Sequence, residues 1–252
     1  KAEAEASMRA AMAKGPAARS ASGSQRLGEY LDEWLGTVGP RLQETTAASY
    51  RVGVERLKAG LGGVRLRDLT PLAIERFYGD LSRTGGRHGQ GLSAKTVRNT
   101  HIVLRKALAD AERLGVVDLN VASRAKAPSQ SRGEVRTWSS SELSRFLAGV
   151  ADDPHYALWV LLATTGLRRG EALGLRWSDL DLERRTLSVS QTITTIQHRI
   201  VVSSPKSDRS RRRIVLDADT VRVLEQHRET QRAEAELMGW DVSPSGLVFT
   251  QG

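Results

Sequence analysis

Arg168 and Glu171 lie three residues apart in the run TGLRRGEALGLRWSDLD, which covers residues 165–181. Gly166 ends the apolar segment that precedes them, and a short helix restarting after this glycine places both side chains on one face. A guanidinium held by a carboxylate is pre-organised for bidentate contact with a phosphate. A structural Arg–Glu pair at a helix junction is the alternative, and the spacing alone favours this structural role.

A lysine that could transfer a proton, Lys206, stands in SSPKSDRSRRRIVLD, which covers residues 203–217. Segments rich in β-branched residues on both sides predict two strands joined by a polar turn, with the lysine at or near the hairpin tip. A flexible ammonium in that position could donate a proton to a departing oxygen. Taken alone, Lys206 is better explained as a basic surface residue that neutralises phosphate.

Positive charge is concentrated in two segments of the chain. The sequence holds 38 Lys and Arg against 29 Asp and Glu, a net charge of +9. Residues 82–113 and residues 199–213 each carry a net charge of +5, so the rest of the chain is close to neutral. Clustered cations favour a polyanionic partner, above all nucleic acid, although two solvated surface faces are the alternative. An RNA-binding role is disfavoured because only 5% of the residues are aromatic, too few for a stacking platform.

Several kinds of site are excluded by what the sequence lacks. It has no cysteine, which excludes a disulfide framework and thiolate metal sites. The five histidines show no metal-ligand spacing, and Asp179 and Asp181 are expected to cap or turn the chain rather than bind Mg²⁺. No G-x-x-x-x-G-K-[ST] run is present, and no window of 18 apolar residues predicts a membrane span. The sequence therefore predicts neither a metal site nor a membrane partner.

Residues 26–122 are expected to form a domain of four helices. Apolar residues recur at helical spacing in the first segment, again over about 43–58, and after Thr70–Pro71, a specific helix start. The fourth helix should run from an N-cap at Ser93 to Gly115. The N-terminal end of this helix is suited to reading the major groove of DNA. Candidate DNA contacts on the second and fourth helices are Thr46, Arg51, Lys95, Thr96, Arg98, Asn99 and Arg105.

The character of the sequence changes after residues 123–136, which show no periodicity and are typical of a linker. From Thr137, two helices precede the arginine run, and period-two alternation around Leu187–Ile193 predicts antiparallel strands. A long amphipathic helix is expected over about 218–238, and LVFT at 247–250 predicts a buried strand. The predicted fold class is mainly α with a small antiparallel β-sheet.

The run TGLRRGEALGL, followed by WSDLD, resembles the first catalytic-arginine box of the tyrosine recombinase (phage integrase) family. The order of the predicted elements is similar to that family over most of the chain. The resemblance implies a helical core-binding domain at 26–122 and the N-terminal part of an α+β catalytic domain at 137–252. Residues 1–25 are similar to the interdomain helix and linker that follow an N-terminal arm-binding domain in the family.

This resemblance implies site-specific DNA recombination through a 3′-phosphotyrosine, with neither metal nor ATP as cofactor. It implies that Arg168 binds the scissile phosphate, Glu171 orients the arginine and Lys206 acts as general acid. It further implies a two-domain clamp around duplex DNA, a homotetramer on synapsed sites, and action in the cytoplasm of a bacterial host, at the nucleoid. Phosphate contacts of the catalytic domain are expected after the lysine, at Arg209, Arg211 and Arg212.

Two parts of the family's site are not recognisable in the sequence: the His/Lys-x-x-Arg box and the nucleophilic tyrosine. In the family both follow the strand that LVFT resembles. All four tyrosines of this sequence precede Arg168 and occur at helical spacing among apolar residues. The sequence is therefore expected to be a fragment that binds DNA without cleaving it. A non-catalytic, sequence-specific DNA-binding regulator built on the same scaffold is the alternative.

Overall fold

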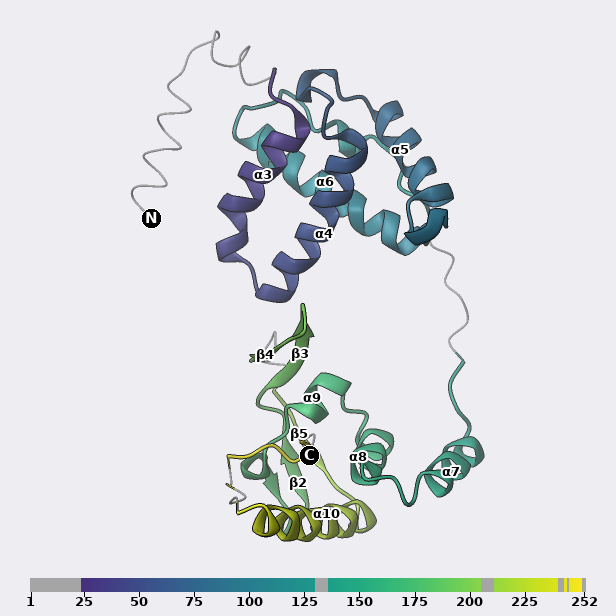
Figure 1. Ribbon diagram of the computed structural model, residues 1–252, viewed down its shortest axis with the longest axis vertical. Helices are drawn as coiled ribbons and strands as arrows, with labels where there is room; N and C mark the ends of the chain where they lie inside the picture. The colour runs from purple at the N-terminus through teal and green to yellow at the C-terminus, as the bar shows by residue number, and fades with distance from the viewer. Residues whose placement is uncertain (1–23, 130–135, 205–210, 240–242, 244, 251–252) are drawn as a thin grey trace, which may run out of the picture. The chain divides into compact units, whose positions relative to one another are not determined.

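The chain is organised as two compact units, each with its own hydrophobic core (Figure 1). The computed structural model describes residues 24–129, 136–204, 211–239, 243 and 245–250. The first unit extends to Gly133 and the second begins at Glu134. The fold is mainly α with a small amount of antiparallel β-structure. Among the residues that the structure describes, no helix is both long and apolar enough to cross a membrane.

The described part of the first unit is built from four long helices joined by short turns. The helices are α3 (Leu27–Val38), α4 (Glu44–Leu61), α5 (Pro71–Thr84) and α6 (Ala94–Arg113), and 3₁₀ turns lie at Gly39–Arg41, Leu66–Asp68, Arg87–Gly89 and Val121–Ser123. Both predicted N-caps are confirmed. The Thr70 hydroxyl accepts a hydrogen bond from the Ala73 N–H at 3.1 Å, and the Ser93 hydroxyl accepts one from the Thr96 N–H at 3.3 Å. Gly115 follows α6 with a φ of 70°, as expected of a C-terminal stop.

Close packing fixes α6 within the first unit. α4 approaches α6 at Gly53, where a Cβ would lie 2.8 Å from Cγ2 of Val103, so glycine is what permits the contact. From α3, the Tyr30 hydroxyl donates a hydrogen bond to the Ala107 carbonyl of α6 at 2.8 Å. One face of α6 is thereby held against the core, and its opposite face is exposed to solvent.

The second unit combines helices with two small sheets. Its helices are α7 (Ser140–Gly149), α8 (Tyr156–Thr165), α9 (Arg169–Leu173) and α10 (Ala218–Leu237), with a 3₁₀ turn at Trp177–Asp179; its strands are β1 (Leu180–Asp181), β2 (Thr186–Ser188), β3 (Thr192–Ile196), β4 (Arg199–Ser203) and β5 (Arg213–Val215). Leu161 of α8, Leu187 of β2 and Leu224 of α10 are fully buried together in the core of this unit. The long helix predicted over about 218–238 is confirmed as α10.

β2 is the middle strand of the core sheet, with β1 and β5 antiparallel on its two sides. Leu187 of β2 lies opposite Leu180 of β1 and Ile214 of β5. Because Leu187 is fully buried, this register is set by the apolar face of the sheet. β3 and β4 form a separate two-stranded hairpin.

The prediction that the strands flanking Lys206 pair as a hairpin is wrong for the strands that the structure describes. β4 pairs with β3, and the turn of that hairpin lies at Gln197–His198, where both residues have positive φ. β5 pairs with β2 instead. The physical reason is burial: Ile200 and Val202 of β4 are 73% and 56% exposed, so β4 contributes nothing to the core sheet and pairs with its neighbour in sequence.

The segment predicted as a buried strand near residue 248 does enter the core, although it forms only a single isolated bridge. Val248 and Phe249 are buried. The Val248 N–H donates to the Leu175 carbonyl at 2.8 Å, and Arg176 forms the bridge with Leu247. This contact ties the chain after α10 to the segment that follows α9.

Candidate functional site

Arg168 lies at the junction between two helices of the second unit. α8 ends at Gly166, whose φ of 64° lies in the left-handed region that favours glycine, and the chain then enters α9. Arg168 is the N-cap residue of α9, and its backbone N–H donates to Oε2 of Glu171 at 2.9 Å. Its guanidinium donates from Nη1 to Oε1 of the same carboxylate, also at 2.9 Å. The backbone and the side chain of Arg168 are thus tied to one group.

The Glu171 carboxylate is almost fully buried and binds a second arginine. Its side chain is 6% exposed, and Arg212 donates to both of its oxygens, from Nη1 to Oε1 at 3.1 Å and from Nη2 to Oε2 at 2.8 Å. The contact with Arg212, together with the donors of Arg168, lowers the pKa of Glu171 from 4.5 to about 2 in spite of its burial. The same contact raises the pKa of the Arg212 guanidinium. Glu171 is therefore ionised at neutral pH and joins α9 to the residue that precedes β5.

Sequence reasoning assigned Arg212 to a DNA contact and missed its contact with Glu171. The two residues are 41 positions apart, and the pairing of β5 with β2 brings them together. Local spacing cannot reveal such a pair. The sequence gives one indication that Glu171 has a second partner. Glu171 follows an apolar helix and is expected to be buried, and a buried carboxylate needs cationic or hydrogen-bonding partners.

The Arg168 side chain is exposed even though its anchor is buried. It is 77% exposed, so most of the guanidinium faces solvent while Nη1 remains on Glu171. Because the carboxylate fixes the orientation in advance, less rotamer entropy is lost when an anion binds. The arrangement suits contact with phosphate oxygens and stabilisation of the negative charge that develops on them during a reaction.

α9 packs directly against β3 at Gly170, a close approach that a larger side chain would prevent. A Cβ at Gly170 would lie 2.6 Å from the Thr192 hydroxyl and 2.7 Å from the Ile193 carbonyl oxygen. The Gln191 amide also donates to the Gly174 carbonyl at 2.8 Å. The close contact between α9 and the β3–β4 hairpin therefore fixes the position of Arg168, and this contact leaves no room for a side chain larger than glycine at residue 170.

A pocket of about 400 Å³ adjoins the Glu171 ion pair. Its lining residues are Ser188, Val189, Ser190, Arg211, Arg212 and Arg213. Arg211 and Arg213 are exposed, so cations are available at the surface next to the buried pair. Of the residues predicted to act here, Lys206 and Arg209 lie outside the described residues.

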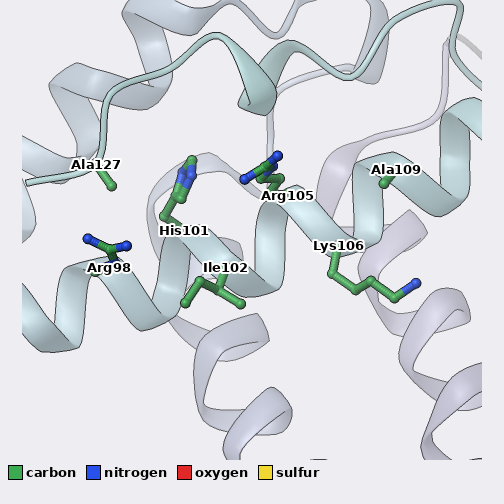
Figure 2. A pocket seen from close by; sticks show the side chains of 7 residues that line it. All are labelled: Arg98, His101, Ile102, Arg105, Lys106, Ala109 and Ala127. Carbon is green, nitrogen blue, oxygen red and sulfur yellow. The ribbon is translucent and has the colours of Figure 1, made fainter.

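A second concentration of basic side chains lies on the exposed face of α6 (Figure 2). A pocket of about 490 Å³ is lined there by Arg98, His101, Ile102, Arg105, Lys106, Ala109 and Ala127. Two of the predicted DNA contacts, Arg98 and Arg105, are brought together in this lining. His101 and Lys106 were not predicted, although their spacing of three and eight residues from Arg98 places them on the same side of the helix.

The remaining predicted DNA contacts lie outside this pocket lining. Lys95 and Asn99 are exposed on α6, and Arg51 is exposed on α4. Thr46 is half-buried on α4. Thr96 is half-buried as well, and its hydroxyl lies 2.9 Å from that of Ser93. Thr96 is therefore partly occupied in capping α6.

The residues that follow the arginine box support the scaffold. Asp179 accepts hydrogen bonds from Nε of Arg176 at 3.1 Å and from the Ser190 hydroxyl at 2.7 Å. Trp177 is buried, and its indole N–H donates to Oε1 of Gln231 at 2.7 Å. The prediction that Asp179 caps or turns the chain agrees with these contacts, which link the 3₁₀ turn to the segment after β2.

Two family models match the chain one after the other. The phage integrase N-terminal SAM-like domain matches residues 26–82, within the first unit. The phage integrase family matches residues 139–233, which contain the Arg168–Glu171 pair and Arg212.

A curated relative is similar to the chain over most of its length. A tyrosine recombinase XerC-like protein of Caldanaerobacter subterraneus subsp. tengcongensis is 27% identical over 209 residues, which cover 75% of this chain and 52% of the relative. The chain spans about half the length of the curated relatives it matches.

Solved structures show the same fold. The Tn1549 transposon integrase in complex with a circular intermediate DNA superposes with a TM-score of 0.67 at 20% identity, covering 82% of this chain and 66% of that one. A lambda integrase tetramer bound to a Holliday junction gives a TM-score of 0.60 at 18% identity, covering 82% of this chain and 55% of that one. Because both family models match in succession and the fold agrees with these structures, the chain belongs to the tyrosine recombinase (phage integrase) family.

Proposed function

We propose that this chain is the DNA-binding and phosphate-binding part of a site-specific DNA recombinase of the tyrosine class. The observation that carries the proposal is the Arg168 guanidinium, which is exposed to solvent yet oriented by the buried carboxylate of Glu171. In this proposal residues 26–122 form the core-binding domain and residues 137–252 form the N-terminal part of the catalytic domain. The two domains contact one duplex as a clamp, with residues 123–136 as their linker.

The proposed reaction is transesterification at a DNA phosphate. A tyrosine oxygen attacks phosphorus, a 3′-phosphotyrosine bond forms, the bond to the 5′-oxygen breaks, and Lys206 gives that oxygen a proton. A 5′-hydroxyl of the partner duplex then reverses these steps, so the phosphodiester energy is retained and no ATP is consumed. Arg168 stabilises the charge on the non-bridging oxygens, and Glu171 with Arg212 holds it in position. The four tyrosines of this sequence are buried or half-buried within helices, so we assign the nucleophile to none of them.

DNA contacts are assigned to the exposed faces of α6 and α4 and to the basic segment before β5. Major-groove contact is proposed for α6, since a helix fits that groove and its cations are exposed. The proposed contacts are Thr46, Arg51, Lys95, Thr96, Arg98, Asn99 and Arg105 in the first unit, and Arg209 and Arg211 in the second. Assembly as a homotetramer on synapsed duplexes, in the cytoplasm of a bacterial host, is part of the proposal. The lambda integrase tetramer on a Holliday junction supports this state.

The rival function is a DNA-binding regulator that uses the basic surfaces but makes no use of Arg168. A suicide half-site, in which a nicked strand is lost after cleavage, distinguishes the two when it is given to the full-length protein. The recombinase forms a covalent protein–DNA adduct, and a regulator forms none.

Replacing Arg168 tests the assigned role directly. Arg168→Ala should lower adduct formation by about 10²- to 10³-fold, as loss of one pre-organised donor does, while DNA affinity changes only a few-fold. Arg169→Ala is the matched control, because this neighbouring arginine is also exposed but has no assigned role. Equal loss of adduct in both variants, or loss of DNA binding in parallel with the adduct in Arg168→Ala, would contradict the proposal.

A further inference from the structure

His101 stands in the wall of the α6 pocket and is hydrogen-bonded to a buried tyrosine of α5. Nδ1 of His101 lies 2.9 Å from the Tyr78 hydroxyl oxygen, and the two rings meet edge to face at 5.6 Å. Tyr78 is 2% exposed, whereas His101 is half-buried and faces the pocket. In Figure 2 the imidazole ring stands between the side chains of Arg98 and Arg105. One ring nitrogen is therefore occupied within the protein, while the residue itself lines the pocket.

The hydrogen bond of the Tyr78 hydroxyl determines which nitrogen of His101 carries the proton. Burial raises the pKa of the Tyr78 hydroxyl, so the hydroxyl keeps its proton. Among the described residues, His101 is the sole hydrogen-bond partner of this hydroxyl. A Tyr78 O–H that donates to Nδ1 is satisfied, while the reverse arrangement leaves a buried donor unpaired. Nδ1 is thus the acceptor, and in the neutral ring the proton lies on Nε2.

The imidazole is held in its neutral form by its surroundings. Burial, followed by the positive charges of Arg105 and Arg98, lowers the pKa of His101. The polar side chains that line the pocket are consequently all donors: Nε2–H of His101, the two guanidiniums and the Lys106 ammonium. A ligand of this pocket must present hydrogen-bond acceptors.

The pocket also has an apolar member that phosphate binding alone does not explain. Ile102 is 49% exposed among these cations. A thymine methyl group in the major groove offers such a side chain a contact, and base edges carry acceptors such as purine N7, guanine O6 and thymine O4. Ala109 and Ala127 keep the remaining walls small. The composition of the pocket therefore favours base edges over the phosphate backbone.

We propose that His101 is a specificity-determining residue of the DNA interface, donating a hydrogen bond from Nε2–H to an acceptor on a base edge, and that Tyr78 is the positioning residue that fixes this tautomer. The inference rests on the proposed function, in which the exposed face of α6 enters the major groove. Arg98 and Arg105 supply charge on either side, and His101 supplies a neutral, directional donor between them.

Nitrogen-15 NMR of the full chain tests the tautomer without DNA. At neutral pH, Nδ1 of His101 should show the shift of an unprotonated nitrogen and Nε2 that of a protonated one. Tyr78→Phe removes the hydroxyl but keeps the ring, and it should abolish this preference. Tyr30→Phe is the matched control, because it removes another buried hydroxyl, bonded to the Ala107 carbonyl, and should leave His101 unchanged. A protonated Nδ1 in the wild-type chain would overturn the role of Tyr78.

Selection of DNA sites from a randomised library tests the base contact. His101→Leu should relax the preference at one or two adjacent base pairs and weaken binding to the selected site by about 2- to 10-fold, the range for loss of one neutral hydrogen bond. Its salt dependence should stay unchanged, whereas Arg98→Ala should reduce the salt slope by about one. His101→Gln, which keeps a donor, should restore part of the preference.

The outcomes separate this inference from the proposed function. An unchanged base preference in His101→Leu overturns the inference while the DNA-binding function stands. A reduced salt slope in this variant would show that a charged imidazole contacts phosphate, and it overturns the inference as well. Failure of the wild-type chain to bind any duplex would reject the function itself. Circular dichroism and urea unfolding of each variant check that the helical unit is folded under the conditions of the DNA-binding assays.

Discussion

Replacing Glu171 with glutamine removes the charge that holds the arginine box together. The carboxylate accepts two hydrogen bonds from Arg168 and two from Arg212. A glutamine oxygen retains part of this capacity, but its amide nitrogen is a donor and faces guanidinium donors. The depression of the Glu171 pKa from 4.5 to about 2 corresponds to about 3 kcal/mol of stabilisation of the ionised form. Since the Arg212 side chain is 31% exposed, we expect Glu171→Gln to lower the free energy of unfolding by about 2–3 kcal/mol at pH 7.

The pH dependence of this loss has a definite sign. A carboxylate with a depressed folded-state pKa stabilises the fold above its unfolded pKa, and the contribution disappears as pH falls through the folded value. The stability difference between wild type and Glu171→Gln should therefore be complete above pH 4.5 and shrink as pH falls toward 2. The difference between the two proteins is used because the pKa of Asp217, lowered by hydrogen bonds from Thr220, gives both proteins a further acid dependence of stability that cancels in the comparison.

Urea unfolding followed by tryptophan fluorescence measures both effects on the full chain. The transition of the helical unit, which lacks residue 171, is the internal reference. Asp219→Asn is the matched control: it removes a carboxylate from an ion pair with Arg222 in which both side chains are more than three-quarters exposed, and it should cause no measurable loss. A loss below about 0.5 kcal/mol for Glu171→Gln at pH 7, or a difference that grows in acid, would refute the reasoning.

Three further outcomes are expected, two from contacts around α9 and one from the basic surfaces. Gly170→Ala places a methyl group against the Thr192 hydroxyl and the neighbouring carbonyl, and should cost about 1–3 kcal/mol in urea unfolding, whereas Gly149→Ala, with open space around its Cβ, should not destabilise. Arg212→Ala should raise the pKa of Glu171 in an NMR titration and slow cleavage by the full-length recombinase without altering the salt slope of DNA binding, and a reduced slope would instead make Arg212 a phosphate contact. Duplex affinity of the chain should fall by about 10³- to 10⁵-fold between 50 and 200 mM salt if six to ten phosphates are contacted, and a flat response measured by fluorescence anisotropy would exclude a clamp.

The helices of the first unit could be predicted because their signals are local. Thr70 with Pro71 begins one helix, and Ser93 with Gly115 brackets another, and each signal acts through hydrogen bonds within four residues. The Arg168–Glu171 pair was accessible for the same reason, since three residues separate its members.

Contacts that depend on tertiary register could not be predicted in this way. The Arg212–Glu171 contact requires β5 to pair with β2, whereas the sequence predicts a hairpin of β5 with β4. Ile200 stands in an apolar run of β4, and its exposure, which separates β4 from the core sheet, is evident only in the folded unit. Likewise His101 meets Tyr78 because α5 packs on α6, so its tautomer has no signature in the neighbouring residues.

The seat of α9 on the β3–β4 hairpin has a geometric consequence for Lys206. Gly170 adjoins Thr192, which pairs with Ser203 at the end of β4, and Lys206 follows Ser203 by three positions in the sequence. Three residues of extended chain span about 10 Å at most, so this register limits how far the proposed general acid can lie from the strand on which α9 packs. Inserting a few glycines between Ser203 and Lys206 would lengthen this connection and keep every described contact. The rate of strand cleavage by the full-length protein would then report how strongly the proposed reaction depends on the distance between Lys206 and Arg168.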